Sequence, residues 1–399
     1  MSDVAERLEE LRASGLHRRL RLVEGAQGPR VQLDGKPVLL LCSNNYLGLA
    51  DHPRVRNAAA EAALGWGAGA GGSRLISGNM APHRQLEERL AAFKGYETAL
   101  LFGSGYLANV GTISALAGPD TVVFSDELNH ASIVDGCRLA RAKTFVYRHG
   151  DVEHLAWGLG EAGESASLIV TDGVFSMDGD VAPLEDLARL AQDHGCRLMV
   201  DEAHATGAMG PGGRGSVAAA GLSDEVDLVV GTLGKALGSY GAHVCASAEL
   251  SEYLLNSARS FIFSTALPPP TVAAALAALE LLEAEPERVR TLSANAATLR
   301  DGLLAEGLAA GGGESQIVPL EVGDAGRTME LCERLLERGV FAQGIRPPTV
   351  PRGSSRLRFS VMATHEPADL REAAKLAGEA ARELGITVPQ ATGSLPVAA

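Results

Sequence analysis

The sequence predicts an α/β fold with a large domain on a mainly parallel seven-stranded sheet and a small C-terminal α+β domain. Short continuous apolar runs alternate with helical segments, which is typical of a parallel sheet covered on both faces. Beyond Pro286 the pattern changes to amphipathic helices with short strands. The length of 399 residues and the 46% hydrophobic and 21% charged composition suit two or three globular domains.

The first fifty residues are expected to form a helix and short strands that precede the large domain. Residues 4–22 predict a charged helix with Leu8, Leu11 and Leu20 on one face. The stretch VQLDGKPVLLLC then predicts a hairpin whose turn is Asp34-Gly35, because an Asp-Gly pair between apolar runs favours a two-residue turn.

The large domain is expected over residues 51–284. Helical segments such as 105–117 and 183–194 fall between most of its expected strands. The seven strands are expected at 98–102, 121–124, 144–147, 167–171, 197–200, 226–230 and 242–246. An Ala/Leu-rich helix at 270–284 then leads away from the sheet.

The small domain is expected over residues 285–385. Its helices are expected at 287–309 and 327–338, and its strands at 316–321 and 356–361. The final stretch, residues 386–399, has no periodicity and is expected to be a flexible tail.

The net charge, the N-terminal sequence and the cysteine spacing argue against a nucleic-acid-binding, secreted, membrane-spanning or metal-binding protein. The net charge of −14 argues against a general nucleic-acid binder, which needs a basic surface. The N-terminal residues are charged throughout, unlike a signal peptide, and no apolar run is long enough to span a membrane. The five cysteines have no metal-binding or redox spacing. We therefore expect a cytoplasmic protein with reduced thiols, no metal, and no nucleic-acid or membrane partner.

Lysine is rare, and one lysine has an unusual setting. Arginine supplies thirty of the thirty-five positive charges. Lys36, Lys94, Lys143 and Lys375 stand beside polar or turn residues and are expected at the surface. Lys235 lies in VVGTLGKALGSYGA, where an apolar strand meets small residues and glycines. That environment suits an amine that a ligand must reach and that burial must desolvate.

Polar residues follow five of the expected strands. In open α/β sheets, ligands bind at the carboxyl ends of the strands. Each feature alone has an ordinary structural explanation, such as a helix cap or a turn, but five at successive strand ends indicate a site. In chain order they are Gly103-Ser104-Gly105-Tyr106, His130, Ser176, Asp201 with His204, and Thr232 with Lys235.

Pyridoxal phosphate chemistry needs this set of groups. A lysine amine binds the cofactor aldehyde, and a carboxylate, here Asp201, keeps the pyridine nitrogen protonated. Two charges about 4 Å apart at an effective dielectric near 20 interact by about 4 kcal/mol, or about three pKa units. The amides of Gly105 and Tyr106 at a helix N-terminus could bind the phosphate. Thr232 would add a hydroxyl.

The residues alone leave some contacts of the cofactor open and disfavour two other kinds of site. Ser264 or Thr265 could also contribute a hydroxyl to the phosphate site. The imidazole of His130 could stack on the cofactor ring, and His204 could reach its phenolic oxygen. A metal site at Asp201 and His204 is disfavoured because no third ligand lies nearby and Glu202 should point to the opposite side. The run GTLGKALG lacks P-loop spacing.

From about residue 15 to about residue 385 the chain resembles the α-oxoamine synthases of pyridoxal phosphate fold type I. The resemblance rests on SNNYLGL, GAGAGGSRLISG, LFGSGYLAN, DELNHASI, TDGVFSMDGD, VDEAHATG and GTLGKALG. The block IRPPTVPRGSSRLRFS at 345–360 looks most like the branch that uses a pimeloyl thioester. Other branches, of the glycine C-acetyltransferase and 5-aminolevulinate synthase types, carry different residues there and remain the alternatives.

The resemblance implies a role for each residue around the cofactor. Lys235 would bind the cofactor and remove the Cα proton of the amino acid. Asp201 would pair with the pyridine nitrogen, and His130 would stack on the ring and contact substrate. His204 and Ser176 would lie near the phenolic oxygen. The phosphate would be held by Gly105, Tyr106 and Thr232.

The resemblance also implies the substrate contacts and the reaction. Arg358 would clamp the amino acid carboxylate with Asn44 nearby. Thr349 and an N-terminal arginine would contact the acyl substrate; Arg18 is preferred, with Arg19 or Arg21 as alternatives. The implied reaction is the decarboxylative condensation of L-alanine with pimeloyl-CoA or a pimeloyl carrier protein in a homodimeric acyltransferase of biotin biosynthesis. An aminotransferase on the same fold is a less favoured alternative.

Overall fold

The computed structural model describes residues 3–386, which fall into two compact units. Unit 1 comprises Met1–Tyr46, Met177–Gly179 and Thr291–Ala399, and unit 2 comprises Leu47–Ser176 and Asp180–Arg290. The N-terminal segment thus belongs to the same unit as the C-terminal part of the chain. The four-part domain division expected from the sequence stays a prediction, and the expected tail lies outside the described residues apart from Ile386.

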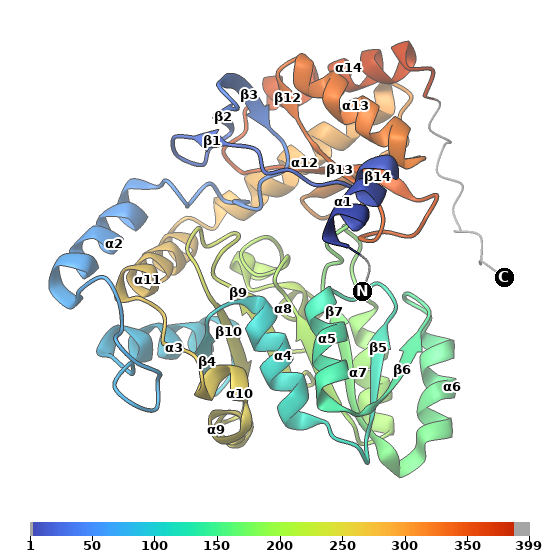
Figure 1. Cartoon of the computed structure of the whole chain (residues 1–399). Helices are drawn as coiled ribbons and strands as arrows, with labels where there is room; N and C mark the ends of the chain where they lie inside the picture. The colour runs from blue at the N-terminus through green and yellow to red at the C-terminus, as the bar shows by residue number, and fades with distance from the viewer. Residues whose placement is uncertain (1–2, 387–399) are drawn as a thin grey trace. The chain divides into compact units, whose positions relative to one another are not determined.

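Unit 2 contains the predicted seven-stranded sheet (Figure 1), in the order β4-β10-β9-β8-β7-β5-β6. Six strands are mutually parallel, and β10 is antiparallel to both of its neighbours. All seven lie within two residues of their predicted bounds. They are β4 (Thr98–Phe102), β5 (Val122–Asp126), β6 (Lys143–Tyr147), β7 (Ala166–Asp172), β8 (Arg197–Asp201), β9 (Leu228–Thr232) and β10 (Ala242–Ala246).

Helices cover both faces of this sheet, because its strands are apolar on both sides. On one face α4, α5, α9 and α10 pack over a core that includes Phe102, Val170 and Met199. On the other face α6, α7 and α8 pack over a core that includes Phe124, Ile169 and Val200. The helices are α4 (Gly105–Leu116), α5 (Ala131–Ala140), α6 (Val152–Ala162), α7 (Leu184–Asp193), α8 (Ser216–Ala220), α9 (Ala248–Ser257) and α10 (Arg259–Ile262).

Three more helices complete unit 2. Helix α2 (Pro53–Trp66) lies along α11 (Pro269–Ala284), and α3 (Ala81–Lys94) packs against both β4 and α11 (Figure 1). Helix α11 matches the predicted Ala/Leu-rich helix. Its buried face, which includes Val272, Leu279 and Leu282, explains the high apolar content of that segment.

Unit 1 contains two small sheets. The hairpin β2 (Arg30–Leu33) and β3 (Lys36–Leu40) is confirmed, with positive φ at Asp34 and Gly35 as this tight turn requires. It forms a four-stranded sheet with β1 (Val23–Glu24) and β12 (Val340–Phe341). The second sheet has the order β11-β14-β13, with β11 (Ile317–Gly323), β13 (Gln343–Ile345) and β14 (Ser355–Ser360).

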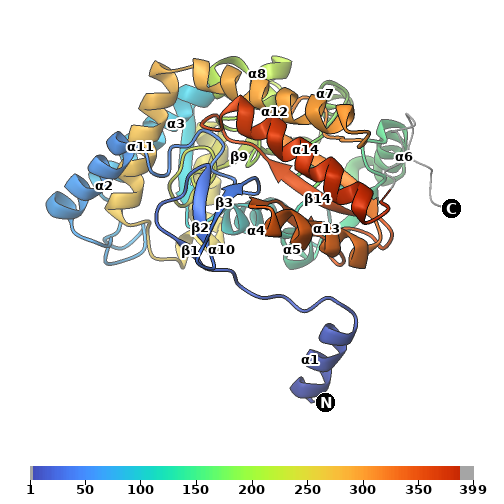
Figure 2. The ribbon, with the colours of Figure 1, turned by 90° about the horizontal axis from the view of Figure 1, so that it is seen from above.

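The helices of unit 1 pack on these strands. Helices α13 (Ala325–Glu337) and α14 (Pro367–Glu383) lie side by side next to β14 (Figure 2). Helix α12 (Glu287–Ala305) begins at the predicted residue and ends four residues before the predicted end. Among the described residues, the model has no helix long and apolar enough to cross a membrane.

The predicted N-terminal helix is too long. Helix α1 ends at Ala13, because Ser14 caps it and Gly15 adopts a left-handed conformation with φ 68°. Residues 14–22 continue without helix. The proposed apolar face is also wrong, since Leu8, Leu11 and Leu20 are all exposed and α1 buries no residue. Arg18, Arg19 and Arg21 therefore lie on a segment without regular secondary structure.

The surface position expected for Lys94 is wrong as well. Its side chain is 2% exposed and forms an ion pair with Glu202, which is fully buried. Lys94 also donates to Thr206 Oγ1 at 2.9 Å and to the Arg214 carbonyl at 2.6 Å. A buried ammonium needs such partners to offset the cost of leaving water. This lysine belongs to the core beneath the sheet.

Candidate functional site

Asp201 is buried at the carboxyl end of β8 and is held by two donors. The Asn109 amide donates to Asp201 Oδ2 at 2.6 Å, and the Ala203 N–H donates to Oδ1 at 2.8 Å. Glu202 turns away, as expected, and accepts from Ser216 Oγ at 2.9 Å. A carboxylate with both oxygens in hydrogen bonds has a fixed orientation. The strand end therefore presents a fixed anion.

Lys235 and His204 are brought together. Lys235 lies in the turn after β9, half-buried, and its Nζ is 2.8 Å from Nε2 of His204, which follows β8. Lys235 N–H can donate to an imidazole nitrogen that carries no proton. The residues that follow β8 and β9 therefore lie within hydrogen-bonding distance of each other.

The N-terminus of α4 offers amide donors, as the Gly-Ser-Gly sequence suggested. Ser104 caps the helix, and its Oγ accepts the Leu107 N–H at 3.2 Å. The N–H groups of Gly105 and Tyr106 have no acceptor within the helix, since first-turn amides never do. The Tyr106 hydroxyl donates to Asp135 Oδ2 at 2.6 Å, and this bond raises the pKa of the tyrosine. Backbone N–H groups here suit a phosphate.

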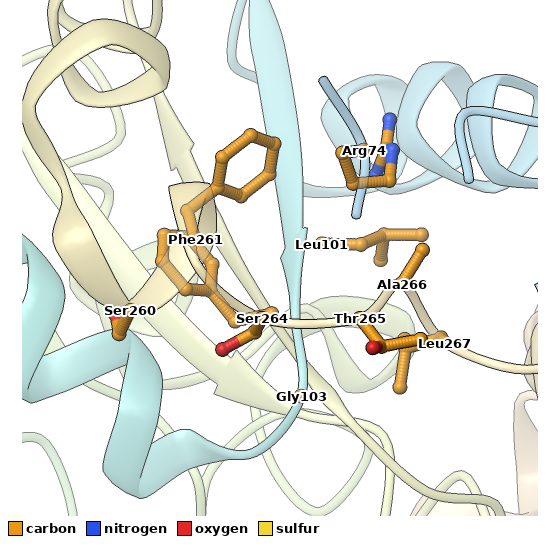
Figure 3. A pocket seen from close by; sticks show the side chains of 10 residues that line it. Arg74, Leu101, Gly103, Ser260, Phe261, Ser264, Thr265, Ala266 and Leu267 are labelled. Atoms are coloured by element: carbon orange, nitrogen blue, oxygen red, sulfur yellow. The ribbon is translucent and has the colours of Figure 1, made fainter. Parts of the chain in front are cut away.

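Hydroxyl groups stand near this helix end on the same unit. Ser264 and Thr265 line a small pocket together with Gly103 and Arg74 (Figure 3). Thr232 is half-buried at the end of β9, where its Oγ1 donates to the Gly241 carbonyl at 3.1 Å. That proton must turn away from the backbone before Thr232 can donate to a phosphate. The phosphate role of Thr232 stays a prediction.

His130 caps α5 and has a defined hydrogen-bond pattern. Its Nδ1 lies 2.7 Å from Ser132 Oγ and accepts the Ser132 N–H at 3.2 Å. Its own backbone N–H donates to Asp172 Oδ2 at 2.8 Å. Although the residue is exposed, desolvation by nearby protein lowers the pKa of His130, with a smaller lowering from Lys235, and Asp201 opposes both. Burial thus works against a charged imidazole at this position.

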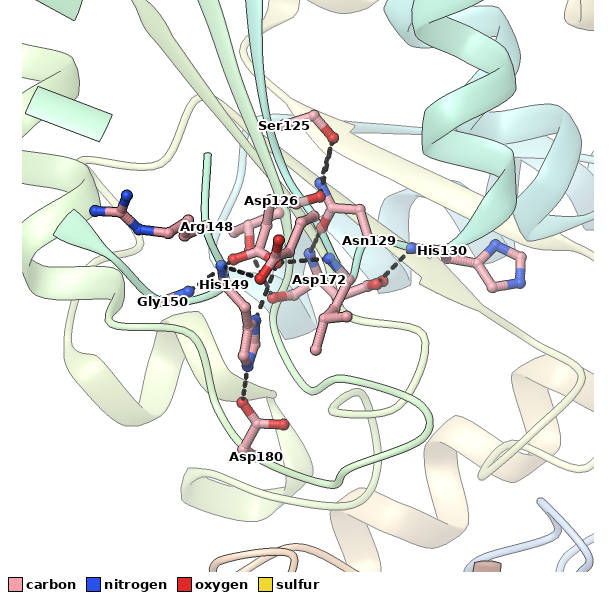
Figure 4. A network of polar contacts seen from close by, with 12 residues as sticks. Ser125, Asp126, Asn129, His130, Arg148, His149, Gly150, Asp172 and Asp180 are labelled. Atoms are coloured by element: carbon pink, nitrogen blue, oxygen red, sulfur yellow. Dashed lines mark hydrogen bonds and ion pairs between the residues drawn. The ribbon is translucent and has the colours of Figure 1, made fainter. Parts of the chain in front are cut away.

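A polar network fixes the backbone that carries His130 (Figure 4). Asn129 donates to Val170 O at 2.8 Å and accepts the Asp172 N–H at 2.9 Å, which joins the ends of β5 and β7. His149, after β6, lies 3.0 Å from Asp126 Oδ1 and 2.8 Å from Asp180 Oδ2. Desolvation works against protonation, but the two carboxylates outweigh it and raise the pKa of His149 to about 10.

Other groups were missed or stay untested. Ser176 is half-buried in the loop after β7, and its cofactor role stays a prediction. Asp172 was missed, although it ends β7 opposite Asp201 in the sheet register. Burial, and then the charge of Asp201, raise the pKa of Asp172 well above its usual range. Asn109 was missed because an asparagine inside an apolar helical segment gives no signal in the sequence.

Unit 1 holds the predicted amino acid clamp. Arg358, on β14, is 6% exposed, and both terminal nitrogens lie 3.4 Å from Asn44 Oδ1. Its Nη1 also donates to Ser360 Oγ at 2.9 Å. Arg356 on the same face is paired with Asp178, so it is not a solvent-exposed strand charge. The family resemblance implied that Asn44 lies near Arg358, and the two side chains are in contact. The contact of Arg358 with a substrate stays a prediction.

A second pocket, which lies in unit 1 and has a volume of about 460 Å³, is lined by both Arg18 and Thr349. Arg21 also lines it but is engaged by Asp34 and Glu333, and Arg19 is 3.7 Å from Glu333. Within residues 3–386, Arg18 takes part in no ion pair. Other lining residues are His17, Met329, Phe341 and Arg346. The pocket is thus strongly cationic, and Arg18 is its arginine with the fewest internal commitments.

The donor set of unit 2 fits pyridoxal phosphate. Unit 2 supplies the Lys235 amine, the buried Asp201 anion, the His130 imidazole and the free amides at the start of α4. The cofactor needs an amine for its aldehyde and an anion for its pyridine nitrogen. It also needs a flat side chain against its ring face and amide donors for its phosphate. The chemistry of the residues therefore matches the cofactor part by part.

Comparison with known proteins agrees with this reading. Residues 36–376 match the family of class I and II aminotransferases. The chain is 56% identical to the 8-amino-7-oxononanoate synthase of Citrifermentans bemidjiense, over 97% of this chain and all of that protein. It is 54% identical to the synthase of the same name from Geotalea daltonii, again over 97% of this chain and all of the relative.

Solved structures of related enzymes share the fold. A serine palmitoyltransferase from S. paucimobilis with a bound PLP–myriocin aldimine is 35% identical and superposes with a TM-score of 0.91, covering 96% of this chain and 98% of that chain. The 8-amino-7-oxononanoate synthase of Francisella tularensis is 29% identical with a TM-score of 0.76, covering 88% of this chain and 99% of that one.

Proposed function

This chain belongs to the class I and II aminotransferase family, as an α-oxoamine synthase, and we propose that it makes 8-amino-7-oxononanoate from L-alanine and a pimeloyl thioester. A carbon–carbon bond forms between the alanine Cα and the thioester carbonyl, the carbon–sulfur bond breaks, and the alanine carboxylate leaves as carbon dioxide. The observation that carries the proposal is more than 50% identity to 8-amino-7-oxononanoate synthases over nearly the whole chain. The alternative is another α-oxoamine synthase with a different acyl donor.

The residues of unit 2 would divide the work at the cofactor. Bound pyridoxal phosphate supplies an electron sink for the charge left when a bond to Cα breaks. Lys235 would hold the cofactor and then move the Cα proton, and His204 at 2.8 Å would orient its amine. Asp201 would keep the pyridine nitrogen protonated, while His130 would cover the ring face. Ser176 would contact the cofactor near His204, and Gly105, Tyr106 and Thr232 would bind the phosphate.

Arg358 would bind the alanine carboxylate. A guanidinium presents parallel N–H donors that match a carboxylate in a bidentate pair. Arg358 is almost fully buried, so its charge is weakly screened by solvent. The contact with Asn44 would hold the guanidinium plane in position.

The cationic pocket of unit 1 supports an acyl donor whose chain ends in a free carboxylate. A pimeloyl chain ends in a carboxylate, whereas acetyl and palmitoyl chains do not. Arg18 would bind that carboxylate and Thr349 would contact the acyl chain, since both line the pocket. Arg21 is the poorest candidate of the three N-terminal arginines, because Asp34 and Glu333 already bind it.

We also propose that the enzyme works as a homodimer in the cytoplasm. Leu64, Ile76 and Phe263 of unit 2 are large, apolar and exposed, and such side chains often mark a protein interface. Ser73 pairs with Thr265 in a β-bridge, so the segments that carry Ile76 and Phe263 are neighbours. All five cysteines are unpaired in the structure, which suits a reducing compartment.

A substrate panel tests the function. Alanine, glycine and serine are each combined with acetyl-, succinyl-, pimeloyl- and palmitoyl-thioesters, and release of free thiol is followed. Alanine with the pimeloyl thioester should give the highest kcat/KM. A higher value for another pair would assign a different synthase. Rapid conversion of the cofactor to its pyridoxamine form by L-alanine alone would indicate an aminotransferase instead.

A pair of neighbouring arginines tests the acyl pocket. Arg18→Gln should raise the KM for the pimeloyl thioester at least about tenfold, because a charged hydrogen bond contributes about 1.5–3 kcal/mol. Arg19→Gln removes the same charge one residue away and is the matched control. Its KM should change by less than about threefold, because Arg19 is already paired with Glu333 at 3.7 Å. Equal effects of the two variants would contradict a specific role for Arg18.

A further inference from the structure

A continuous chain of hydrogen bonds links Asp201, expected at the pyridine nitrogen, to His130, expected on the face of the cofactor ring. The Asn109 amide donates to Asp201 Oδ2 at 2.6 Å and to Ser132 Oγ at 2.8 Å. Ser132 Oγ in turn lies 2.7 Å from His130 Nδ1. Asn109 and Ser132 are 1% and 0% exposed, so solvent cannot replace these bonds.

Proton counting gives the chain one direction. The Asn109 group that faces Asp201 at 2.6 Å must be the NH₂, because an amide oxygen would repel a carboxylate oxygen at that distance. Both amide protons of Asn109 are then used, one on Asp201 and one on Ser132. Ser132 Oγ accepts from Asn109, so its single proton is available for His130 Nδ1.

The same counting fixes the tautomer of His130. Its Nδ1 faces two donors, the Ser132 hydroxyl at 2.7 Å and the Ser132 backbone N–H at 3.2 Å. A nitrogen that accepts from both cannot carry a proton itself. The ring proton of the neutral imidazole is therefore on Nε2.

We propose that Asn109 and Ser132 are positioning residues: one hydrogen-bond chain fixes the orientation of the Asp201 carboxylate and holds His130 as its Nε2–H tautomer. This inference rests on the proposed placement of Asp201 and His130 around the cofactor. One amide proton of Asn109 points toward the Asp201 carboxylate and the other toward Ser132 Oγ. The Ser132 hydroxyl proton then points toward His130 Nδ1. The imidazole that covers the cofactor ring would then carry its proton on Nε2.

The charged groups around His130 are compatible with this state. Asp201 on β8 favours the imidazolium, whereas Lys235 after β9 opposes it. Asp172 on β7 binds the backbone N–H of His130 rather than its ring. Among the contacts of the described residues, none of these three groups accepts a hydrogen bond from Nδ1. Ser132 is therefore the residue that decides which ring nitrogen carries the proton.

The tautomer can be measured without cofactor or substrate. In cofactor-free protein labelled with ¹⁵N-histidine, long-range ¹H–¹⁵N spectra report which ring nitrogen carries the proton, and His130→Asn assigns the signals. Wild-type His130 should show a bare Nδ1 and a protonated Nε2. Ser132→Ala should lower the ratio of the two tautomers about fivefold, as expected for loss of one net hydrogen bond. Ser132→Thr should restore it.

Asn109→Ala tests the other end of the chain, with Asn295→Ala as the matched control. Asn295 is also buried and donates two hydrogen bonds, but to backbone carbonyls of unit 1. In the holoenzyme, Asn109→Ala should lower kcat about tenfold or more with little change in the KM for alanine, whereas Asn295→Ala should lower stability alone.

Any of three results overturns the proposal: a protonated Nδ1 in the wild type, an unchanged tautomer ratio in Ser132→Ala, or an equal loss of kcat in Asn109→Ala and Asn295→Ala. If Asn109→Ala fails to fold, the Ser132 series decides alone. A failure of the substrate panel leaves the tautomer result standing, so the two ideas fail separately.

Discussion

Asp201→Asn is expected to remove most of the catalytic rate while leaving the fold in place. The substitution keeps the shape of the side chain and deletes its charge. One of its two oxygens becomes an NH₂ that faces a donor, either the Asn109 amide at 2.6 Å or the Ala203 N–H at 2.8 Å. The variant therefore loses both the anion and one of the bonds that orient it.

The size of the effect follows from these two losses. A unit charge about 4 Å from the pyridine nitrogen at an effective dielectric near 20 interacts by about 4 kcal/mol. A mismatched buried donor costs about 1–3 kcal/mol more, chiefly in stability. Because about 1.4 kcal/mol corresponds to a factor of ten in rate, kcat should fall by about 10² to 10³.

Asp172→Asn is the matched control. Asp172 ends the neighbouring strand in register with Asp201, but burial and the Asp201 charge already favour its neutral form. An asparagine there can still accept the His130 N–H through its oxygen. Its kcat, followed as thiol release with alanine and pimeloyl-CoA, should fall less than about tenfold. Near-normal turnover of Asp201→Asn, or equal losses in both variants, would refute the assignment of Asp201.

Three further changes test the chemistry and the packing. Lys235→Ala should abolish turnover without altering the circular dichroism spectrum, and detectable turnover above background would contradict its role. Lys94→Met should lower the free energy of unfolding by about 3–5 kcal/mol in urea, because it strands the buried Glu202 carboxylate; the double variant with Glu202→Gln should recover part of this loss. His149→Gln should destabilise the protein most below pH 6.5. Because the folded pKa of His149 is about 10, its contribution is lost as pH rises toward 10, at about 1.4 kcal/mol per pH unit at most, and a pH-independent difference would refute this.

The sequence predicted the sheet well because its signals are local. Short apolar strands between helical segments are read directly from neighbouring residues, and the Asp34-Gly35 turn has its own chemistry. The clustering of polar residues at the strand ends could be predicted for the same reason, since each lies within four residues of the end of its strand; their roles at a cofactor stay predictions. Arg358 and Asn44 needed the family resemblance, because nothing local joins residues more than three hundred positions apart.

The errors and omissions share a physical cause. Lys94 looks like a surface residue next to Gly95, and only Glu202, 108 positions later, explains its burial. Asn109 and Ser132 lie within helical segments, where a polar residue is usually a solvent-facing or capping group. The end of α1 was missed because Gly15 stops the helix while charged residues continue beyond it. In each case the deciding partner or backbone state is not visible in a short window.

The consecutive residues Asp201 and Glu202 face opposite directions and contact different groups. One is the anion expected at the cofactor; the other is locked to Lys94 in the interior. A redesign that shifts Asp201 to admit a different coenzyme ring would also move Glu202, because the two residues are adjacent. That movement would disturb the buried ion pair of Glu202 with Lys94. Redesign of this enzyme for new cofactors should therefore begin in the core, at residues that no ligand ever meets.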